Sequence, residues 1–246
     1  MKHCFYIFAL MLCTGSLMAA GAADKFSDAN QYYAEGKFAD AAKGYEAILS
    51  SGTVSLNLFF NCGDAEFKSG NLGRAIAAYR QAALLAPRDA EVRANLEFAR
   101  NQVQGATQHE SSWTRWLGAL TLNEWTALAA IAFWLTFILF AATQIRPALK
   151  GALSGVARYA AVAAVLFCAC VGMSTAIHSS RQVAVVVMPD AVTRSGPFDD
   201  AQNAFAVHDG AELPVLDRHG GWVEVSDSAG RTGWMLDSQV EVLPEI

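Results

Sequence analysis

Few residues in this chain of 246 amino acids have the types and spacing that acid–base or metal chemistry needs. Beyond the first apolar segment the histidines are His109, His178, His208 and His219, and none has the H-E-x-x-H spacing of a zinc protease. No G-x-S-x-G nucleophile motif and no glycine-rich phosphate loop occurs. We interpret the adjacent acidic pair Asp199–Asp200 as solvated surface. The sequence therefore predicts no catalytic residues, no metal site and no cofactor, and a protein that is not an enzyme.

The five cysteines do not suggest a disulfide framework. Cys4 and Cys13 lie in the first apolar segment, and Cys168 and Cys170 lie in the third. Only Cys62 falls in a segment that we expect to be soluble, and the chain has no C-x-x-C pair. Neither zinc binding nor thioredoxin-like redox chemistry is therefore predicted.

The charge of the chain argues against nucleic acid as a partner. The formal net charge is −5, so a phosphate backbone would repel the protein on average. The charge is also uneven, because residues 182–246 contain three basic and eleven acidic residues, a local charge of −8. Such a segment is poorly suited to docking on an anionic lipid or wall surface.

The elements that carry the remaining candidate residues begin with a repeat. Similar residue types recur 34 residues apart, in the pairs Gly36/Gly70, Phe38/Leu72, Ala41/Ala75, Tyr45/Tyr79 and Ile48/Ala82. The period and the residue types resemble the tetratricopeptide repeat, whose unit is a helix–turn–helix. The resemblance implies an all-α helical repeat domain over residues 23–104, with two repeats and a capping helix. Arrays of this kind need about three units for stability, so we expect this one to depend on a partner or on the membrane-proximal segment.

Tetratricopeptide domains bind peptides in a groove lined by the first helix of each repeat. By register, the resemblance implies that the groove presents Asn30, Tyr33, Phe60, Asp64, Phe67 and Lys68. The alternative for the three aromatic side chains is packing between the helices. The alternative for Asp64 and Lys68, which are four residues apart, is an ion pair with each other.

Two uncharged apolar runs, residues 125–145 and 159–177, are each about as long as a bilayer-spanning helix needs to be. We predict a transmembrane helix for each. Trp113, Trp116 and Trp125 lie in or next to the linker at residues 105–124, which is typical of an interfacial aromatic belt.

The orientation of these helices follows from charge. Arg146, Lys150 and Arg158 lie in the predicted loop over residues 146–158, which has no acidic residue, and the positive-inside rule places that loop in the cytoplasm. Residues 1–22 resemble a secretory signal peptide, with an uncleaved anchor helix as the alternative. Both signals predict a multi-pass protein of the bacterial cytoplasmic (inner) membrane with its two soluble domains on the extracytoplasmic side.

The second predicted transmembrane helix carries a stripe of small residues that would let another helix approach closely. The stripe recurs every four residues, at Ala160, Ala164, Cys168, Gly172 and Ala176. It rotates by about 40° per step on a helix of 3.6 residues per turn. Only two or three of its members can therefore face one partner, and chance in an alanine-rich helix is the alternative.

Residues 182–246 change to short alternating runs separated by turn residues, which predicts strands. The candidate strands are residues 182–188, 191–194, 212–216, 222–225, 233–235 and 239–243. The turn residues and Gly-Trp pairs resemble the bacterial SH3 domain, which implies an all-β SH3-like barrel that folds as a separate unit. Trp222 and Trp234 are expected at its core or rim, with a ligand-binding role as the alternative.

The order of these segments resembles that of BatE-like proteins of the Bacteroides aerotolerance operon family. The matching stretches are residues 61–65, 70–76, 86–89, the N-L-E-F-A-R run at 95–100, and the N-E-W entry to the first membrane helix at 123–125. The resemblance implies a non-enzymatic membrane-anchored adaptor or scaffold. Its expected partners are von Willebrand A-domain membrane proteins linked to a MoxR-type ATPase, with a role in oxidative-stress tolerance or aerotolerance. The alternative is a cell-wall-binding receptor whose SH3-like domain reads peptidoglycan while the repeats recruit an envelope enzyme.

Overall fold

The computed structural model describes residues 23–103, 116–118, 120–178 and 182–243. The expected signal peptide over residues 1–22 and most of the linker lie outside these residues. The chain divides into two compact units. One contains Met1–Gln108 together with Gln182–Pro244, and the other contains His109–Arg181.

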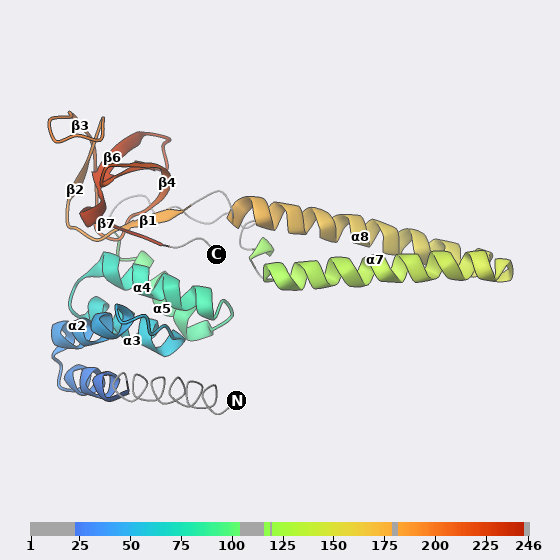
Figure 1. Ribbon diagram of the computed structural model, residues 1–246, viewed down its shortest axis with the longest axis horizontal. Coiled ribbons are helices and arrows are strands. Elements are labelled where there is room, and N and C mark those ends of the chain that lie inside the picture. The colour runs from blue at the N-terminus through green and yellow to red at the C-terminus, as the bar shows by residue number, and fades with distance from the viewer. Residues whose placement is uncertain (1–22, 104–115, 119, 179–181, 244–246) are drawn as a thin grey trace, which may run out of the picture. The chain divides into compact units, whose positions relative to one another are not determined.

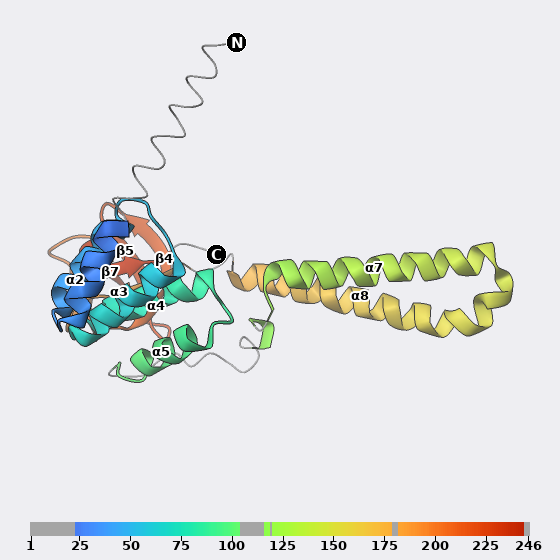
Figure 2. The same cartoon turned by 90° about the horizontal axis from the view of Figure 1, so that it is seen from below.

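The first unit begins with helical hairpins (Figures 1 and 2). A helix over residues 23–34 is followed by α2 (Phe38–Leu49), α3 (Leu56–Lys68), α4 (Leu72–Leu85) and α5 (Ala90–Arg100). Gly36 (φ +76°) and Gly70 (φ +86°) adopt the left-handed conformation that ends the first helix of each hairpin. The helices can pack closely because the residues between them are small. A Cβ atom at Gly63 of α3 would lie 2.7 Å from the ring of Tyr79 on α4.

The second part of this unit is an antiparallel sheet of seven strands in the order β3-β2-β6-β5-β4-β1-β7. The strands are β1 (Val183–Val186), β2 (Ala191–Arg194), β3 (Asn203–Val207), β4 (Glu212–His219), β5 (Trp222–Ser226), β6 (Thr232–Leu236) and β7 (Val240–Val242). Alternating apolar residues such as Val223, Val225 and Met235 point into a common core and are almost fully buried. Six of the strands fall within or across the predicted runs, and β3 was not predicted.

The sheet does not stand apart from the helices. Val185 of β1 and Leu243, which follows β7, belong to the same buried apolar cluster as Ile76 of α4 and Leu96 of α5. The expectation that the sheet folds as a separate unit therefore disagrees with the packing. The physical reason is that α4 and the sheet each leave apolar side chains uncovered on their own, and each covers those of the other.

The second unit contains a hairpin of two long helices, α7 (Leu122–Ile145) and α8 (Lys150–His178) (Figure 2). Both are long and apolar enough to cross a membrane. Thr121 and Glu124 form a capping box at the start of α7. Trp125 donates from Nε1 to the carbonyl oxygen of Leu117 at 3.0 Å.

The connection between these helices is shorter than the predicted loop over residues 146–158. Arg146 ends α7, a single 3₁₀ turn spans Pro147–Leu149, and α8 begins at Lys150. Pro147 breaks the helix because its ring cannot continue the hydrogen-bond ladder. The next residues contain no proline, so the helix runs on from Lys150, and Arg158 lies on it.

Candidate interaction site

The first group of polar contacts links three helices through Asn30. Its Oδ1 atom accepts a hydrogen bond from the hydroxyl of Tyr45 on α2 at 2.6 Å. The same atom accepts a weaker bond from Nδ2 of Asn61 on α3 at 3.3 Å. One side chain thus connects the first helix of a hairpin to its second helix and to the first helix of the next hairpin.

The same arrangement recurs 34 residues later around Asp64. Oδ1 of Asp64 accepts from the hydroxyl of Tyr79 on α4 at 2.5 Å and from Nδ2 of Asn95 on α5 at 3.2 Å. Burial and the neighbouring Asp64 carboxylate raise the pKa of Tyr79, so the phenol stays protonated and donates. The two copies differ in one atom type, because position 30 is a neutral amide and position 64 is a carboxylate.

The three predicted groove aromatics are half-buried, and each packs against another ring. Tyr33 meets Phe38 at 5.2 Å between ring centroids, and Phe60 meets Tyr79 at 6.0 Å. Phe67 meets Phe98 of α5 at 5.5 Å, and Phe98 itself is 55% exposed. Packing and surface exposure therefore coexist. We define the first-helix face as the set Asn30, Tyr33, Phe60, Asp64, Phe67, Asn95 and Phe98.

The alternative interpretation of Asp64 and Lys68 as an ion pair is not seen in the structure. Asp64 bonds Tyr79 and Asn95 instead, and Lys68 at the end of α3 is exposed. Among the described residues no lysine or arginine forms an ion pair with Asp64. The structure thus brings five of the six predicted groove residues into aromatic or hydrogen-bond contacts and leaves Lys68 at the surface.

Behind this face, Glu66 is 2% exposed where the repeat usually has an aromatic residue. Its Oε2 atom accepts from Nδ2 of Asn71 at 2.6 Å, and its Oε1 atom lies 4.0 Å from Nη1 of Arg74. Burial raises the pKa of Glu66, and Glu46 adds to the rise, while Asn71 and Arg74 oppose it. Burial beside these acids also raises the pKa of Cys62 to about 12, so its thiol is not a nucleophile at neutral pH.

The helices and the sheet are joined by a buried ion triad that sequence reasoning missed. Glu212 at the start of β4 pairs with Arg80 of α4 and Arg100 of α5. Arg100 binds it through two hydrogen bonds, of 2.5 Å from Nε and 3.0 Å from Nη2. Burial alone would raise the pKa of Glu212, but the two arginines outweigh it and hold the pKa below its ordinary value. The available signal was charge, since five arginines lie between residues 74 and 100 and the sheet segment is acidic.

A second contact crosses the same boundary at the start of α4. Asn71 does not cap this helix with its side chain. Oδ1 of Asp209, in the turn before β4, accepts from the backbone N–H of Gly73 at 3.1 Å and so supplies the missing cap. A Cβ atom at Gly73 would overlap the carbonyl oxygen of Val186, so only glycine permits this approach.

Trp222 and Trp234 lie on neighbouring strands, β5 and β6. Trp222 is 8% exposed, and the guanidinium carbon of Arg194 lies 5.5 Å from its ring centroid. Trp234 is half-buried and pairs in register with Arg194 on one side and Glu224 on the other. Both tryptophans thus occupy positions between core and rim.

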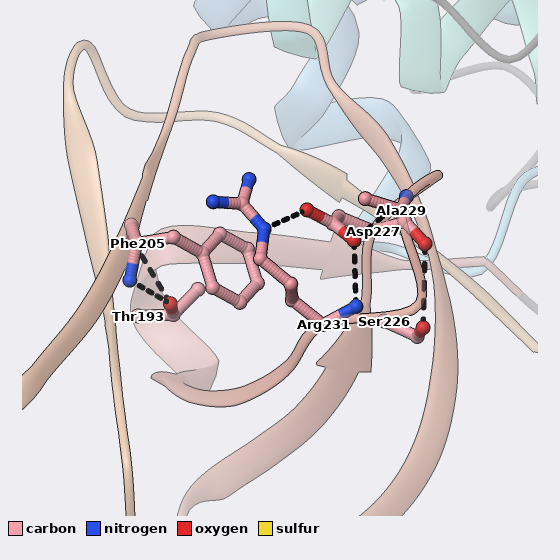
Figure 3. Close-up of polar contacts among 6 residues, drawn as sticks. All are labelled: Thr193, Phe205, Ser226, Asp227, Ala229 and Arg231. Atoms are coloured by element: carbon pink, nitrogen blue, oxygen red, sulfur yellow. Dashed lines mark hydrogen bonds and ion pairs between the residues drawn. The ribbon is translucent and has the colours of Figure 1, made fainter.

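One further charged group on the sheet stabilises a turn (Figure 3). Asp227 accepts from the backbone N–H groups of Ala229 and Arg231 at 2.9 and 2.8 Å, and from Nε of Arg231 at 2.6 Å. The Arg231 guanidinium lies 4.7 Å from the ring centroid of Phe205. The adjacent Thr193 hydroxyl is bonded to both backbone groups of Phe205. These contacts fix β3 and the β5–β6 turn.

The small-residue stripe of α8 divides between two environments. Ala160 is 8% exposed and Ala164 is half-buried in the hairpin, whereas Cys168, Gly172 and Ala176 are exposed. A Cβ atom added at Gly172 would meet nothing within 4 Å. Two of the five members therefore pack within the hairpin.

Among the described side chains, no group of three or more His, Cys, Asp or Glu residues is placed to hold a metal ion. The arrangement offers binding surfaces, with the first-helix face as the best-developed one. No protein-family model matches this chain, and no curated protein matches it.

Proposed function

We propose that this protein is a non-enzymatic, membrane-anchored adaptor that presents its first-helix face to a protein partner. The observation that supports it best is the position of the apolar hairpin in the chain. Residues before and after α7 and α8 fold together as one unit, held by the Glu212 triad and by the shared apolar cluster. The hairpin is thus an insertion that can anchor a single soluble body.

This packing also favours one topology. Segments that share a buried cluster must lie on the same side of a membrane, so the chain between them must cross it an even number of times. Two crossing helices satisfy this condition. Arg146, Lys150 and Arg158 lie at or near the turn between the helices, and the positive-inside rule favours the cytoplasm for that turn. We therefore propose the cytoplasmic membrane, with the soluble unit outside.

The partner class rests on the segment order. We propose that the helices are tetratricopeptide repeats, that the sheet is a bacterial SH3-like domain, and that the chain is BatE-like. The proposal implies a complex with von Willebrand A-domain membrane proteins, associated with a MoxR-type ATPase and with aerotolerance. The alternating hydrogen-bonded links through Asn30 and Asp64 support repeated units of one kind.

The topology is tested with reporter fusions to the full chain. A periplasmic reporter placed after Ile246 or within residues 104–112 should be active, because both sites are expected outside the membrane. A cytoplasmic reporter placed near Ser154 should be active only inside. Activity of the cytoplasmic reporter after Ile246 would contradict both the topology and the adaptor model built on it.

A further inference from the structure

Asp64 is a half-buried carboxylate on the first-helix face whose hydrogen bonds are unevenly distributed. Both bonds, from Tyr79 and from Asn95, end on Oδ1. Oδ2 therefore keeps its capacity to accept. Among the described residues no basic side chain forms an ion pair with this carboxylate, although Lys68 lies one turn away on the same helix.

The negative charge at this position is not needed for the link between helices. Thirty-four residues earlier, Asn30 makes the same two contacts with a neutral amide oxygen, to Tyr45 and Asn61. Partial burial of a carboxylate costs free energy that an amide would not incur. A charge that the fold does not require, retained at a surface, is available for a ligand.

Aromatic rings flank this carboxylate. Phe60 and Phe67 precede and follow Asp64 by about one turn of α3, so all three lie on one side of the helix. Phe98 stands one turn beyond Asn95 on α5 and contacts Phe67 at 5.5 Å. Tyr33 approaches from the first helix, since the Asp64 charge contributes, after burial, to raising the pKa of its phenol. Half-buried rings around one carboxylate suit a cation, because ring faces attract positive charge.

We propose that the first-helix face recognises a basic side chain, lysine or arginine, of an extended partner peptide, with Oδ2 of Asp64 as the acceptor and Phe67 and Phe98 as the aromatic wall. This inference rests on the proposed adaptor function and specifies the chemistry of the partner. A guanidinium suits the site especially well, because it can bind the carboxylate and stack on a ring at the same time.

The test uses the full chain in detergent micelles and pools of short peptides, each pool fixed at its central residue and randomised elsewhere. Pools with central arginine or lysine should bind about five- to tenfold better than pools with central norleucine or glutamate. Asp64→Asn should reduce this preference to within about twofold, because the amide keeps the Tyr79 and Asn95 contacts, as Asn30 does, and loses the charge. Asp40→Asn, an exposed acid on α2, is the matched control and should leave the preference unchanged.

The outcomes separate the two proposals. Binding of peptides without a preference for a basic residue, or a preference that survives Asp64→Asn, would overturn the cation site and leave the adaptor function standing. Absence of binding to every pool would overturn the cation site together with peptide binding by this face. Phe98→Ala supplies a second readout, because this exposed ring can be removed without emptying the core. It should weaken binding of the arginine pool more than that of the norleucine pool.

Discussion

Single residues decide how the two halves of the soluble unit meet. Glu212 brings a carboxylate from the start of β4 to two arginines on different helices. Asp209 brings another to the uncapped start of α4. The pKa of Glu212 is lowered because the arginines outweigh its burial, whereas the pKa of Asp209 is raised because burial outweighs its backbone hydrogen bonds. The two carboxylates should therefore respond oppositely to substitution.

We predict that Glu212→Gln destabilises the soluble unit by about 3 kcal/mol at neutral pH, because it leaves two partly buried arginines without their counter-charge. A carboxylate with a lowered folded pKa stabilises the fold above its unfolded pKa, and this contribution is lost as the pH falls through the folded value. The difference between wild type and Glu212→Gln should therefore shrink below about pH 4. Thermal unfolding of the full chain in micelles, followed by tryptophan fluorescence across pH, measures it.

Two variants serve as controls for this result. Glu224→Gln on β5 removes a carboxylate from the same sheet and should change stability by less than about 0.5 kcal/mol. Asp209→Asn keeps a capping oxygen and removes a charge that burial disfavours, so it should be neutral or slightly stabilising at neutral pH. An equal loss for Glu212→Gln and Glu224→Gln would contradict a specific role for the triad.

At the scale of elements, the helices differ in whether their ends are fixed locally. Asp89 caps α5, and Thr121 with Glu124 caps α7, in each case from residues next to the helix. The start of α4 has no such local cap and is completed by the sheet. The links through positions 30 and 64 then hold successive helices in register. They are equivalent in geometry and different in charge.

We predict that Tyr79→Phe costs more stability than Tyr45→Phe. The Tyr79 hydroxyl donates to a carboxylate, whereas the Tyr45 hydroxyl donates to an amide, and hydrogen bonds to charged groups contribute roughly 1.5–3 kcal/mol against about 1 kcal/mol for neutral ones. Chemical unfolding of the two variants, compared with wild type in the same micelles, gives both values. In the Asp64→Asn background the two losses should become equal. If they stay different, the charge at position 64 is not the cause.

On the scale of the whole molecule, a hairpin of two apolar helices interrupts a single soluble unit. The sheet completes the helical array by covering Ile76 and Leu96 with Val185 and Leu243. Two repeats and a cap are fewer units than such arrays usually need for stability, and the sheet supplies the missing contact. The expected dependence on a partner or on the membrane-proximal segment is met, at least in part, within the chain.

We predict that the two halves associate when the hairpin is removed. Fragments 23–103 and 182–246, co-expressed, should co-purify and unfold together, because each alone exposes the apolar cluster. Glu212→Gln in the second fragment should weaken the association by roughly a hundredfold, which corresponds to about 3 kcal/mol. Analytical ultracentrifugation measures the association. Two monodisperse fragments that do not interact would show that the shared cluster is not what holds the unit together.

The sequence by itself determined the features that depend on local pattern. The period of 34 residues placed the helical hairpins, Gly36 and Gly70 adopt the expected left-handed turns, and apolar length identified the two long helices. The start of α8 was missed because helix length beyond the apolar run depends on where a breaker stands. Strand β3 was missed because its small residues, such as Ala204 and Ala206, carry little strand preference.

Only the tertiary structure decided how distant residues combine. Glu212 lies 132 residues from Arg80, and Asp209 lies 136 residues from Gly73, so neither pairing leaves a periodic signal in the chain. The half-buried state of Phe60 and Phe67, and the choice of Asp64 to bond Tyr79 rather than Lys68, also depend on the neighbouring helices. Periodicity reports which face of an element is apolar. It does not report which other element covers that face, because burial is settled by contacts between segments that are remote in sequence.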